Sequence, residues 1–245
     1  MFFLRLLLIS FILITHAESD TIYSLIGIRN LEILKKNGKE NIVYLKANGS
    51  FQAGLKENNV TCFAAKDESF RQKFALIEES INGYNSNFFK KINLRYIVLC
   101  EDLTIAGINA TGIANSEKKT IIINIKIEPE ILQRIVHHEI FHIINDSFDE
   151  LFSEKNWKNI NDSTFKYADC STCTKQLGLF PYNKTDGFIT EYSKSTASED
   201  MAETFSFLKS NKKILINKAS KDIILKQKVS FILEGIQKID KEFKF

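Results

Sequence analysis

This chain of 245 residues has few prolines and few glycines, and its net charge is small. Only 2 prolines and 10 glycines are present, which excludes collagen-like and low-complexity proteins. The 33 basic residues nearly balance the 30 acidic ones, and a net charge of +3 argues against a nucleic-acid partner. With 44% hydrophobic residues, the chain is long enough to form a substantial core. The composition therefore predicts a globular protein.

Long hydrophobic runs are also missing, because a membrane-spanning helix needs roughly 20 apolar residues. Residues 1–17 instead resemble a secretory signal peptide, in which Arg5 precedes a short apolar run over residues 6–14 and Ala17 supplies a small residue for cleavage. An uncleaved anchor is the alternative interpretation. We expect cleavage after Ala17 and a secreted or periplasmic (extracytoplasmic) protein, with no stable membrane insertion once the leader is removed.

The chain has only 4 cysteines, which are Cys62, Cys100, Cys170 and Cys173. An even number permits two disulfides in an oxidising compartment, and four cysteines allow three connectivities. We favour Cys170–Cys173 as a clamp within a loop, with Cys62–Cys100 as a long bridge. The spacing of Cys170 and Cys173 also suits a redox pair or half of a zinc site, but neither a second CxxC nor a βαβ pattern accompanies it.

Two parts of different character follow the leader. Residues 18–66 carry short alternating segments such as Ile42-Val43-Tyr44-Leu45, which predicts a small β-rich N-terminal subdomain. Residues 67–245 form the larger domain. Their apolar spacing predicts, in chain order, a helix over 68–91, a strand over 94–99, a hairpin of strands 107–114 and 120–127, a helix over 129–146, loops to about residue 190, and helices over 198–210 and 222–242. This order of elements predicts an α+β fold.

The helix expected over 129–146 contains the HExxH motif His138-Glu139-Ile140-Phe141-His142. Residues four apart share a helix face, so both imidazoles can reach one tetrahedral Zn²⁺ at about 2.0–2.1 Å. Glu139 would lie beside the open metal position as the general base for a water molecule. The alternative is a chance match, but only 4 histidines are present, and all three beyond the leader fall at this spot. His137, the third of them, is expected on another face of the helix.

A third ligand cannot be a distant histidine, because none remains. This excludes the HExxHxxGxxH arrangement and disfavours Ser-His-Asp or Cys-His chemistry, so Cys, Asp or Glu must complete the site. Glu199 and Glu203 lie four apart on the next helix, where one can bind zinc and the other can accept a hydrogen bond from a ligating histidine. The alternative is an ordinary acidic first turn capped by Ser198 or Thr196. Tyr192 is either an oxyanion donor or a packed surface residue.

Two blocks of the sequence resemble a known family. His138-Glu139-x-x-His142 followed by Asp146, and then Glu199-x-x-x-Glu203, resembles the gluzincin metallopeptidases, which have the zincin fold. The run Gly187-Phe188-Ile189-Thr190-Glu191-Tyr192 before Glu199 is similar to zinc-binding metallopeptidases and to the catalytic domain of anthrax lethal factor, where a Tyr precedes the Glu ligand by the same interval. The likeness extends from about Glu68 to the C-terminus, but only these two blocks are specific.

The resemblance implies a zincin-like fold with a small mixed sheet, an HExxH helix and a mainly helical C-terminal part. It also implies His138, His142 and Glu199 as the ligands of one Zn²⁺ per chain. The strand over 107–114 would be the sheet edge that pairs with an extended peptide or protein substrate. The opening 50 or so residues and the Cys170–Cys173 loop have no counterpart in the family, so substrate preference does not transfer.

The same resemblance implies roles for four further residues. Glu139 would act as general base and later as proton donor, and Tyr192 would stabilise the oxyanion. Glu203 would accept a hydrogen bond from a ligating histidine, and Asp146 would be a supporting group.

We therefore expect a secreted zinc metallopeptidase that hydrolyses peptide bonds. One alternative is a zinc-containing binding or effector module that clamps a partner along 107–114 without cutting it. Glu139 and an open fourth metal position argue against that module, because structural zinc sites usually have four protein ligands. The other alternative is a zinc hydrolase that acts on non-peptide substrates, which the ligands alone leave open.

Overall fold

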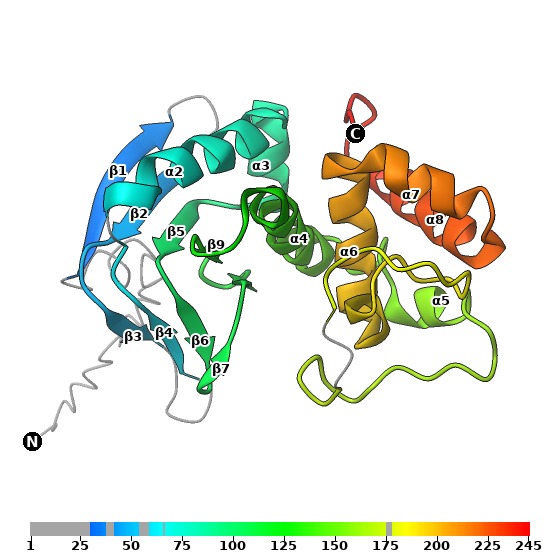
Figure 1. The fold of residues 1–245 in the computed structure, drawn as a ribbon. Coiled ribbons are helices and arrows are strands. Elements are labelled where there is room, and N and C mark those ends of the chain that lie inside the picture. The colour runs from blue at the N-terminus through cyan, green and yellow to red at the C-terminus, as the bar shows by residue number, and fades with distance from the viewer. Residues whose placement is uncertain (1–29, 38–41, 54–58, 66, 175–177) are drawn as a thin grey trace, which may run out of the picture.

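The computed structural model describes residues 30–37, 42–53, 59–65, 67–174 and 178–245. The expected signal peptide and its cleavage point lie outside these residues. Helices and two β-sheets make up the described chain, which confirms an α+β fold (Figure 1). No helix within the described ranges is long and apolar enough to cross a membrane.

Regular elements cover most of the described chain. The strands are β1 (Leu31–Asn37), β2 (Ile42–Ala47), β3 (Phe51–Ala53), β4 (Val60–Cys62), β5 (Tyr96–Cys100), β6 (Leu103–Ile105), β7 (Ile108–Asn109), β8 (Gly112–Asn115) and β9 (Thr120–Asn124). The helices are α2 (Asp67–Asn82), α3 (Ser86–Ile92), α4 (Pro129–Ser147), α5 (Glu154–Lys158), the 3₁₀ turn η1 (Tyr192–Lys194), α6 (Ala197–Ser210), α7 (Lys212–Ala219) and α8 (Ile223–Ile239). Neither α5 nor α7 was expected from the sequence.

The larger sheet has five strands in the order β1-β2-β5-β9-β8. Its three inner strands are parallel, and its two edge strands, β1 and β8, are antiparallel to their neighbours. The smaller sheet is antiparallel, in the order β3-β4-β6-β7. Both sheets combine strands from the two sides of the boundary expected at residues 66 and 67. The division into an N-terminal subdomain and a larger domain stays a prediction.

The single helix expected over 68–91 is wrong, because the chain forms two helices there. Helix α2 ends at Asn82 and is followed by Gly83, a poor helix former. The side chain of Asn85 then accepts a hydrogen bond of 3.0 Å from the backbone N–H of Asn87 and caps α3. Ile81 of α2 and Phe88 of α3 join the same core, so the apolar spacing runs across the break.

The strand expected over 107–114 is also wrong, because it is divided between the two sheets. Ala106 and Gly107 have positive φ angles of 49° and 81°, and they form the tight turn between β6 and β7. The chain then passes Ala110 and Thr111 before β8 pairs with β9. The expected hairpin with residues 120–127 is therefore confirmed only for the part that β8 contributes.

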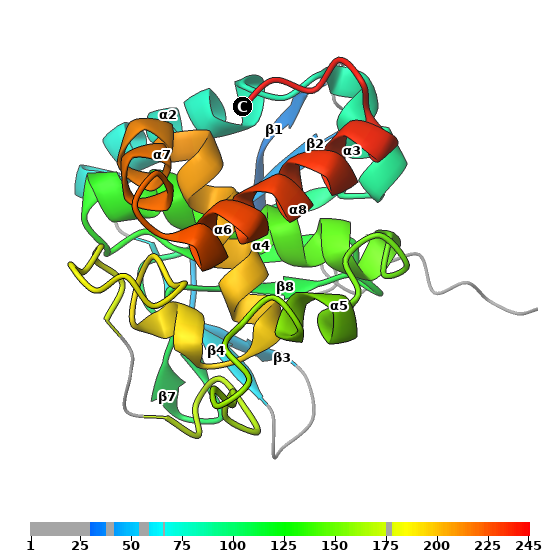
Figure 2. The ribbon, with the colours of Figure 1, turned by 90° about the vertical axis from the view of Figure 1, so that its right-hand side faces the viewer.

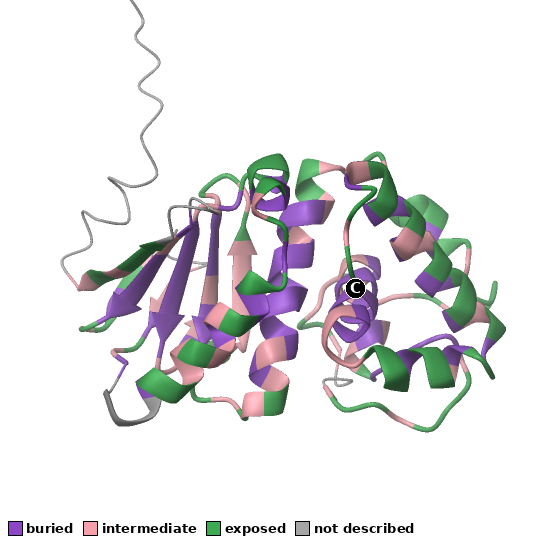
Figure 3. Cartoon of the chain, turned by 90° about the horizontal axis from the view of Figure 1, so that it is seen from above, coloured by how far each residue is buried: buried purple, intermediate pink, exposed green. Residues whose placement is uncertain are grey.

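Helix α4 lies between the sheets and the C-terminal helices (Figures 1 and 2). Pro129 occupies its first turn, where the missing N–H is not needed. One side of α4 packs against β8, β9 and α2, and another side packs against α6. Ile140, Phe141 and Ile144 of α4 are fully buried. Figure 3 shows that the buried residues are concentrated on α4 and on the inner strands of the larger sheet. The HExxH motif thus lies on a rigid, centrally packed helix.

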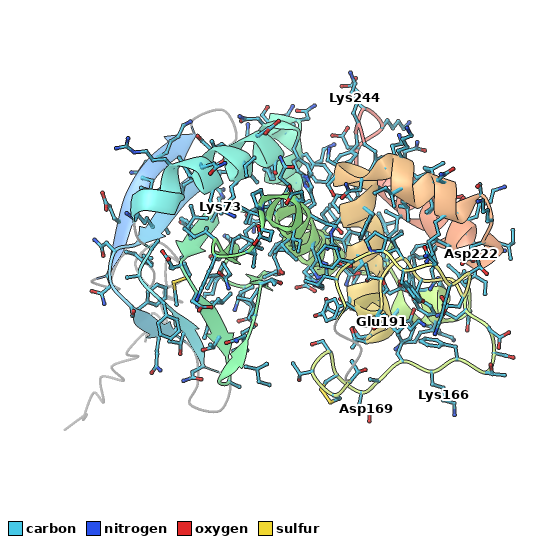
Figure 4. All side chains as sticks on the ribbon, viewed as in Figure 1. Lys73, Lys166, Asp169, Glu191, Asp222 and Lys244 are labelled. Atoms are coloured by element: carbon cyan, nitrogen blue, oxygen red, sulfur yellow. A yellow bond between two sulfur atoms is a disulfide. The ribbon has the colours of Figure 1, made fainter. Side chains whose placement is uncertain are left out.

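Both expected disulfides are present, and Figure 4 shows them in different parts of the molecule. Cys62–Cys100 connects β4 of the smaller sheet to β5 of the larger one, across 38 residues of sequence. Cys170–Cys173 closes a short loop in the segment between α5 and η1. The long bridge therefore fastens the two sheets together, while the short one constrains only its own loop.

A buried ion pair joins α8 to α6. The Lys228 ammonium lies 2.7 Å from the Asp200 carboxylate, and both side chains are fully buried. Asp200 also accepts hydrogen bonds from the Trp157 indole at 2.9 Å and the Tyr167 phenol at 2.6 Å. Lys228 donates to the carbonyl oxygen of Gly187 at 2.8 Å. This cluster fixes α8, α6 and the segment before η1 relative to one another.

Lys228→Met should lower the free energy of unfolding by about 3–5 kcal/mol, because it leaves the Asp200 carboxylate buried without its cation. Urea unfolding of the metal-free protein measures the change. Lys226→Met, on the exposed side of α8, is the matched control and should change stability by no more than about 0.5 kcal/mol. The double variant Lys228→Met/Asp200→Asn should recover much of the loss. Equal stability of Lys228→Met and wild type would contradict the assigned role of the ion pair.

Candidate metal centre

Helix α4 presents both motif histidines on one face, as residues four apart require. The Nε2 atoms of His138 and His142 lie 3.2 Å apart. Glu139 is 5% exposed and belongs to the same buried stretch of the helix. His137 points to another face, where its Nδ1 atom lies 2.8 Å from the hydroxyl of Tyr84. The structure thus separates His137 from the other two histidines, as the helical spacing suggested.

Helix α6 brings a carboxylate to the same point. Thr196 caps this helix, and its hydroxyl accepts a hydrogen bond of 3.2 Å from the backbone N–H of Glu199. This cap fixes the first turn from which the Glu199 side chain projects. The Oε2 atom of Glu199 lies 2.9 Å from His138 Nε2 and 3.4 Å from His142 Nε2.

These three side chains form a group that could hold a metal ion, with their ligand atoms all within 4.8 Å of one another. Tetrahedral zinc with bonds of 2.0–2.1 Å places neighbouring ligand atoms about 3.3 Å apart. The separations of 2.9, 3.2 and 3.4 Å among the two nitrogens and the oxygen are close to that value. The donor set and its spacing therefore fit one zinc ion.

The second ring nitrogen of each histidine has a partner on α6. The Nδ1–H of His138 donates to the Oε1 atom of Glu203 at 3.0 Å, since a carboxylate can only accept. The Nδ1 atom of His142 lies 3.2 Å from the hydroxyl of Ser198. Partners of this kind fix the tautomer and orientation of a ligating imidazole. With both Nδ1 atoms engaged, both Nε2 atoms are left to face Glu199.

The Glu203 carboxylate is itself firmly held. It is fully buried, and its Oε2 atom accepts hydrogen bonds from the Arg134 guanidinium at 2.9 Å and the Thr190 hydroxyl at 2.8 Å. Arg134 also donates to the carbonyl oxygen of Leu179 at 2.6 Å. Glu203 thereby connects α4, α6 and the segment that leads into η1.

Tyr192 and Asp146 differ in how close they lie to this group. The Tyr192 ring centroid is 6.1 Å from that of His138, and its backbone N–H donates to the carbonyl of Gly178 at 3.1 Å. Glu191, the residue before it, is exposed and is labelled in Figure 4. Asp146 is exposed near the end of α4, where its carboxylate accepts a hydrogen bond from the hydroxyl of Ser116 in the β8–β9 turn. The structure therefore brings Tyr192 to the histidines and leaves Asp146 at the surface.

Charge is concentrated in the group. Burial opposes ionisation of His138, but hydrogen bonds to Glu199 and Glu203 outweigh it and raise the His138 pKa to about 10. Burial likewise opposes ionisation of Glu199, yet His142 and His138 hold the pKa of that carboxyl far below its usual range. Burial raises the pKa of Glu139. In the metal-free protein, protons on the histidines compensate carboxylates that a divalent cation would otherwise balance.

Arg134, Thr190 and Ser198 contribute to the site without having been recognised as site residues in the sequence. Arg134 could have been suspected, because it lies four residues before His138 and so shares its face of the helix. The sequence offers Ser198 or Thr196 as the cap of α6, and the structure gives that role to Thr196. Nothing in the local sequence distinguishes Thr190, which reaches Glu203 only because its segment folds back against α6.

Comparisons with known proteins identify one family. No curated protein matches the chain. A solved structure of "a putative zinc-binding metallo-peptidase" from Bacteroides caccae is similar to it, with 14% identity, coverage of 77% of this chain and 76% of that chain, and a TM-score of 0.39. A family model described as "Putative zinc-binding metallo-peptidase" matches residues 85–245, which is well over half of the sequence. On that match, the chain belongs to this family of zinc-binding metallo-peptidases.

Proposed function

We propose that the protein is a zinc-dependent metallopeptidase that hydrolyses peptide bonds. The observation that carries this proposal is the convergence of His138 Nε2, His142 Nε2 and Glu199 Oε2 at separations suited to one tetrahedral zinc ion. Glu139 directly follows His138, and in an HExxH motif the glutamate at this position acts as the general base for the attacking water. The family description supports the same activity.

His138, His142 and Glu199 would hold one Zn²⁺ per chain through two nitrogens and one oxygen. Three protein ligands leave a fourth position open, which is typical of catalytic rather than structural zinc. When bound, the metal supplies a Lewis acid and lowers the pKa of a water molecule to about 7.

Glu139 would take the proton from the attacking water and later deliver it to the leaving amine. Burial raises the pKa of its carboxyl, which brings the group nearer to the pH at which it must both accept and release a proton. The Tyr192 phenol would donate a hydrogen bond to the carbonyl oxygen as negative charge develops on it. The gluzincin resemblance supports this role, and so does the position of the Tyr192 ring near His138.

The substrate that we propose is a peptide or protein in extended form. β8 is an edge strand of the five-stranded sheet, with no further strand beside it among the described residues, and it lies against Glu139. An edge strand can accept a further strand by backbone hydrogen bonds. We also propose that residues 1–17 direct export. The two disulfides support an oxidising compartment.

Glu139→Gln should lower peptide hydrolysis by roughly 10²- to 10⁴-fold, because the amide cannot accept the proton of the attacking water. Zinc content should stay at the wild-type level, since the three ligands are untouched. A peptide-library digest with and without chelator, together with metal analysis, measures both quantities. Glu130→Gln, on the exposed first turn of the same helix, is the matched control and should keep full activity.

Full activity of Glu139→Gln would disprove the role of Glu139. A wild-type protein that binds zinc yet cleaves no peptide would instead favour the binding module or the non-peptide hydrolase.

Zinc affinity should rise with pH. In the metal-free protein the pKa of His138 is about 10, so near pH 7 this ring carries a proton that zinc must displace. Raising the pH reduces the free energy of that displacement, and affinity should increase about tenfold per pH unit for each proton released. Chelator competition between pH 6 and 8 tests the slope, and calorimetry in buffers of different ionisation enthalpy counts the protons. Affinity that is independent of pH would contradict the coupling of zinc binding to proton release.

A further inference from the structure

Gly112, the first residue of β8, lies directly against the Glu139 side chain. A Cβ atom at this position would lie 2.6 Å from the Oε1 atom of Glu139, 2.7 Å from its Cγ and 2.8 Å from its Cδ. These separations are far below van der Waals contact, so the glycine and the carboxylate occupy complementary space. A Cβ atom at position 112 therefore requires a shift, and all three of the nearest atoms belong to the flexible side chain of Glu139.

The conformation of Gly112 does not itself require glycine. Among the described glycines, those with positive φ are Gly107 and Gly187, and Gly112 is paired as an ordinary strand residue with Ile123. Glycine at position 112 is therefore explained by the room that it leaves for the Glu139 side chain and not by its backbone conformation. Ala114, two residues later on the same face, has a side chain that packs against the core that α4 joins.

The backbone of Gly112 also faces the side of β8 on which no other strand of the described chain is paired. The N–H of Asn124 donates to the carbonyl oxygen of Thr111 at 3.0 Å, which marks residues 111 and 124 as a hydrogen-bonded pair. Such pairs alternate along an antiparallel ladder, so the N–H and C=O groups of Gly112 and Ala114 point away from β9. Gly112 therefore has two neighbours: its backbone N–H and C=O groups point to the unpaired side of β8, and its Cα atom lies against the Glu139 carboxylate.

We propose that Gly112 is a positioning residue for Glu139: the missing side chain leaves the space in which the carboxylate is held between α4 and the substrate edge. This inference rests on the proposed peptidase function, because it assigns the position of the general base in that reaction. A methyl group at position 112 would push the carboxylate out of line with the attacking water while leaving the three metal ligands where they are.

The test is Gly112→Ala in the full-length protein. We expect kcat for a cleaved peptide to fall at least about tenfold, because a displacement of about 1 Å can reduce a rate by roughly 10²-fold. KM and the zinc dissociation constant from chelator competition should both stay within about twofold of wild type, since neither depends on the base. A crystal structure of the variant should show the Glu139 carboxylate displaced.

Gly83→Ala is the matched control. It makes the same chemical change at a glycine of ordinary φ, where the nearest atom to an added Cβ is the carbonyl oxygen of Ser80 at 3.4 Å. This variant should keep wild-type kcat. A kcat for Gly112→Ala within about twofold of wild type, with Glu139 unmoved in the crystal, would overturn the inference.

A stability cycle covers the case in which Gly112→Ala is poorly folded. Any fall in the melting temperature of the metal-free protein should disappear in a Glu139→Ala background, because the side chain that the methyl group contacts is then gone. An equal fall in both backgrounds would overturn the inference. This cycle needs no activity, so it still tests the contact between Gly112 and Glu139 if the wild-type protein cleaves no peptide and the proposed function fails.

Discussion

Glu203 is a buried carboxylate of α6 held by three donors from two other segments of the chain, and the geometry of the candidate metal centre depends on it. It accepts hydrogen bonds from His138 and Arg134 of α4 and from Thr190 before η1. A buried carboxylate is strongly destabilising unless such partners compensate it. The need to satisfy this one group therefore sets α4 against α6 and turns the His138 ring so that its Nε2 atom faces Glu199.

The surrounding fold supports that arrangement from both sides. Toward the sheets, β8 lies against α4, and the disulfide Cys62–Cys100 fastens the two sheets to each other. Toward the C-terminus, Lys228 of α8 forms an ion pair with Asp200 of α6, the residue that follows Glu199. The candidate ligands thus come from two helices. Helix α4 packs against α2, β8 and β9, and α6 packs against α5, α7 and α8. Precise positioning of ligands on rigid elements is what metal affinity and catalysis require.

Local sequence predicted which residues share a helix face, and it paired the carboxylates of α6 with the histidines of α4, but it did not predict the other contacts between helices. The rarity of histidine and the spacing of His138 and His142 predicted a metal-binding face, and the interval between Glu199 and Glu203 predicted a pair on one side of α6. Contacts of Ser198 with His142 and of Lys228 with Asp200 join residues far apart in sequence, and no local spacing encodes them. The strand expected over 107–114 is interrupted at Ala110 and Thr111, where the chain passes from the smaller sheet to the larger one, and no local spacing marks that passage.

The most direct test of the metal centre is the metal content of the protein purified without a metal-affinity tag, compared between wild type and Glu199→Ala. We predict one zinc per chain in wild type and little or none in the variant, because Glu199 of α6 would supply one of the three proposed ligands, and the other two would be His138 and His142 of α4. Full zinc in Glu199→Ala would show that the third ligand lies elsewhere. A wild-type protein that holds no zinc even after zinc is added would contradict the central claim.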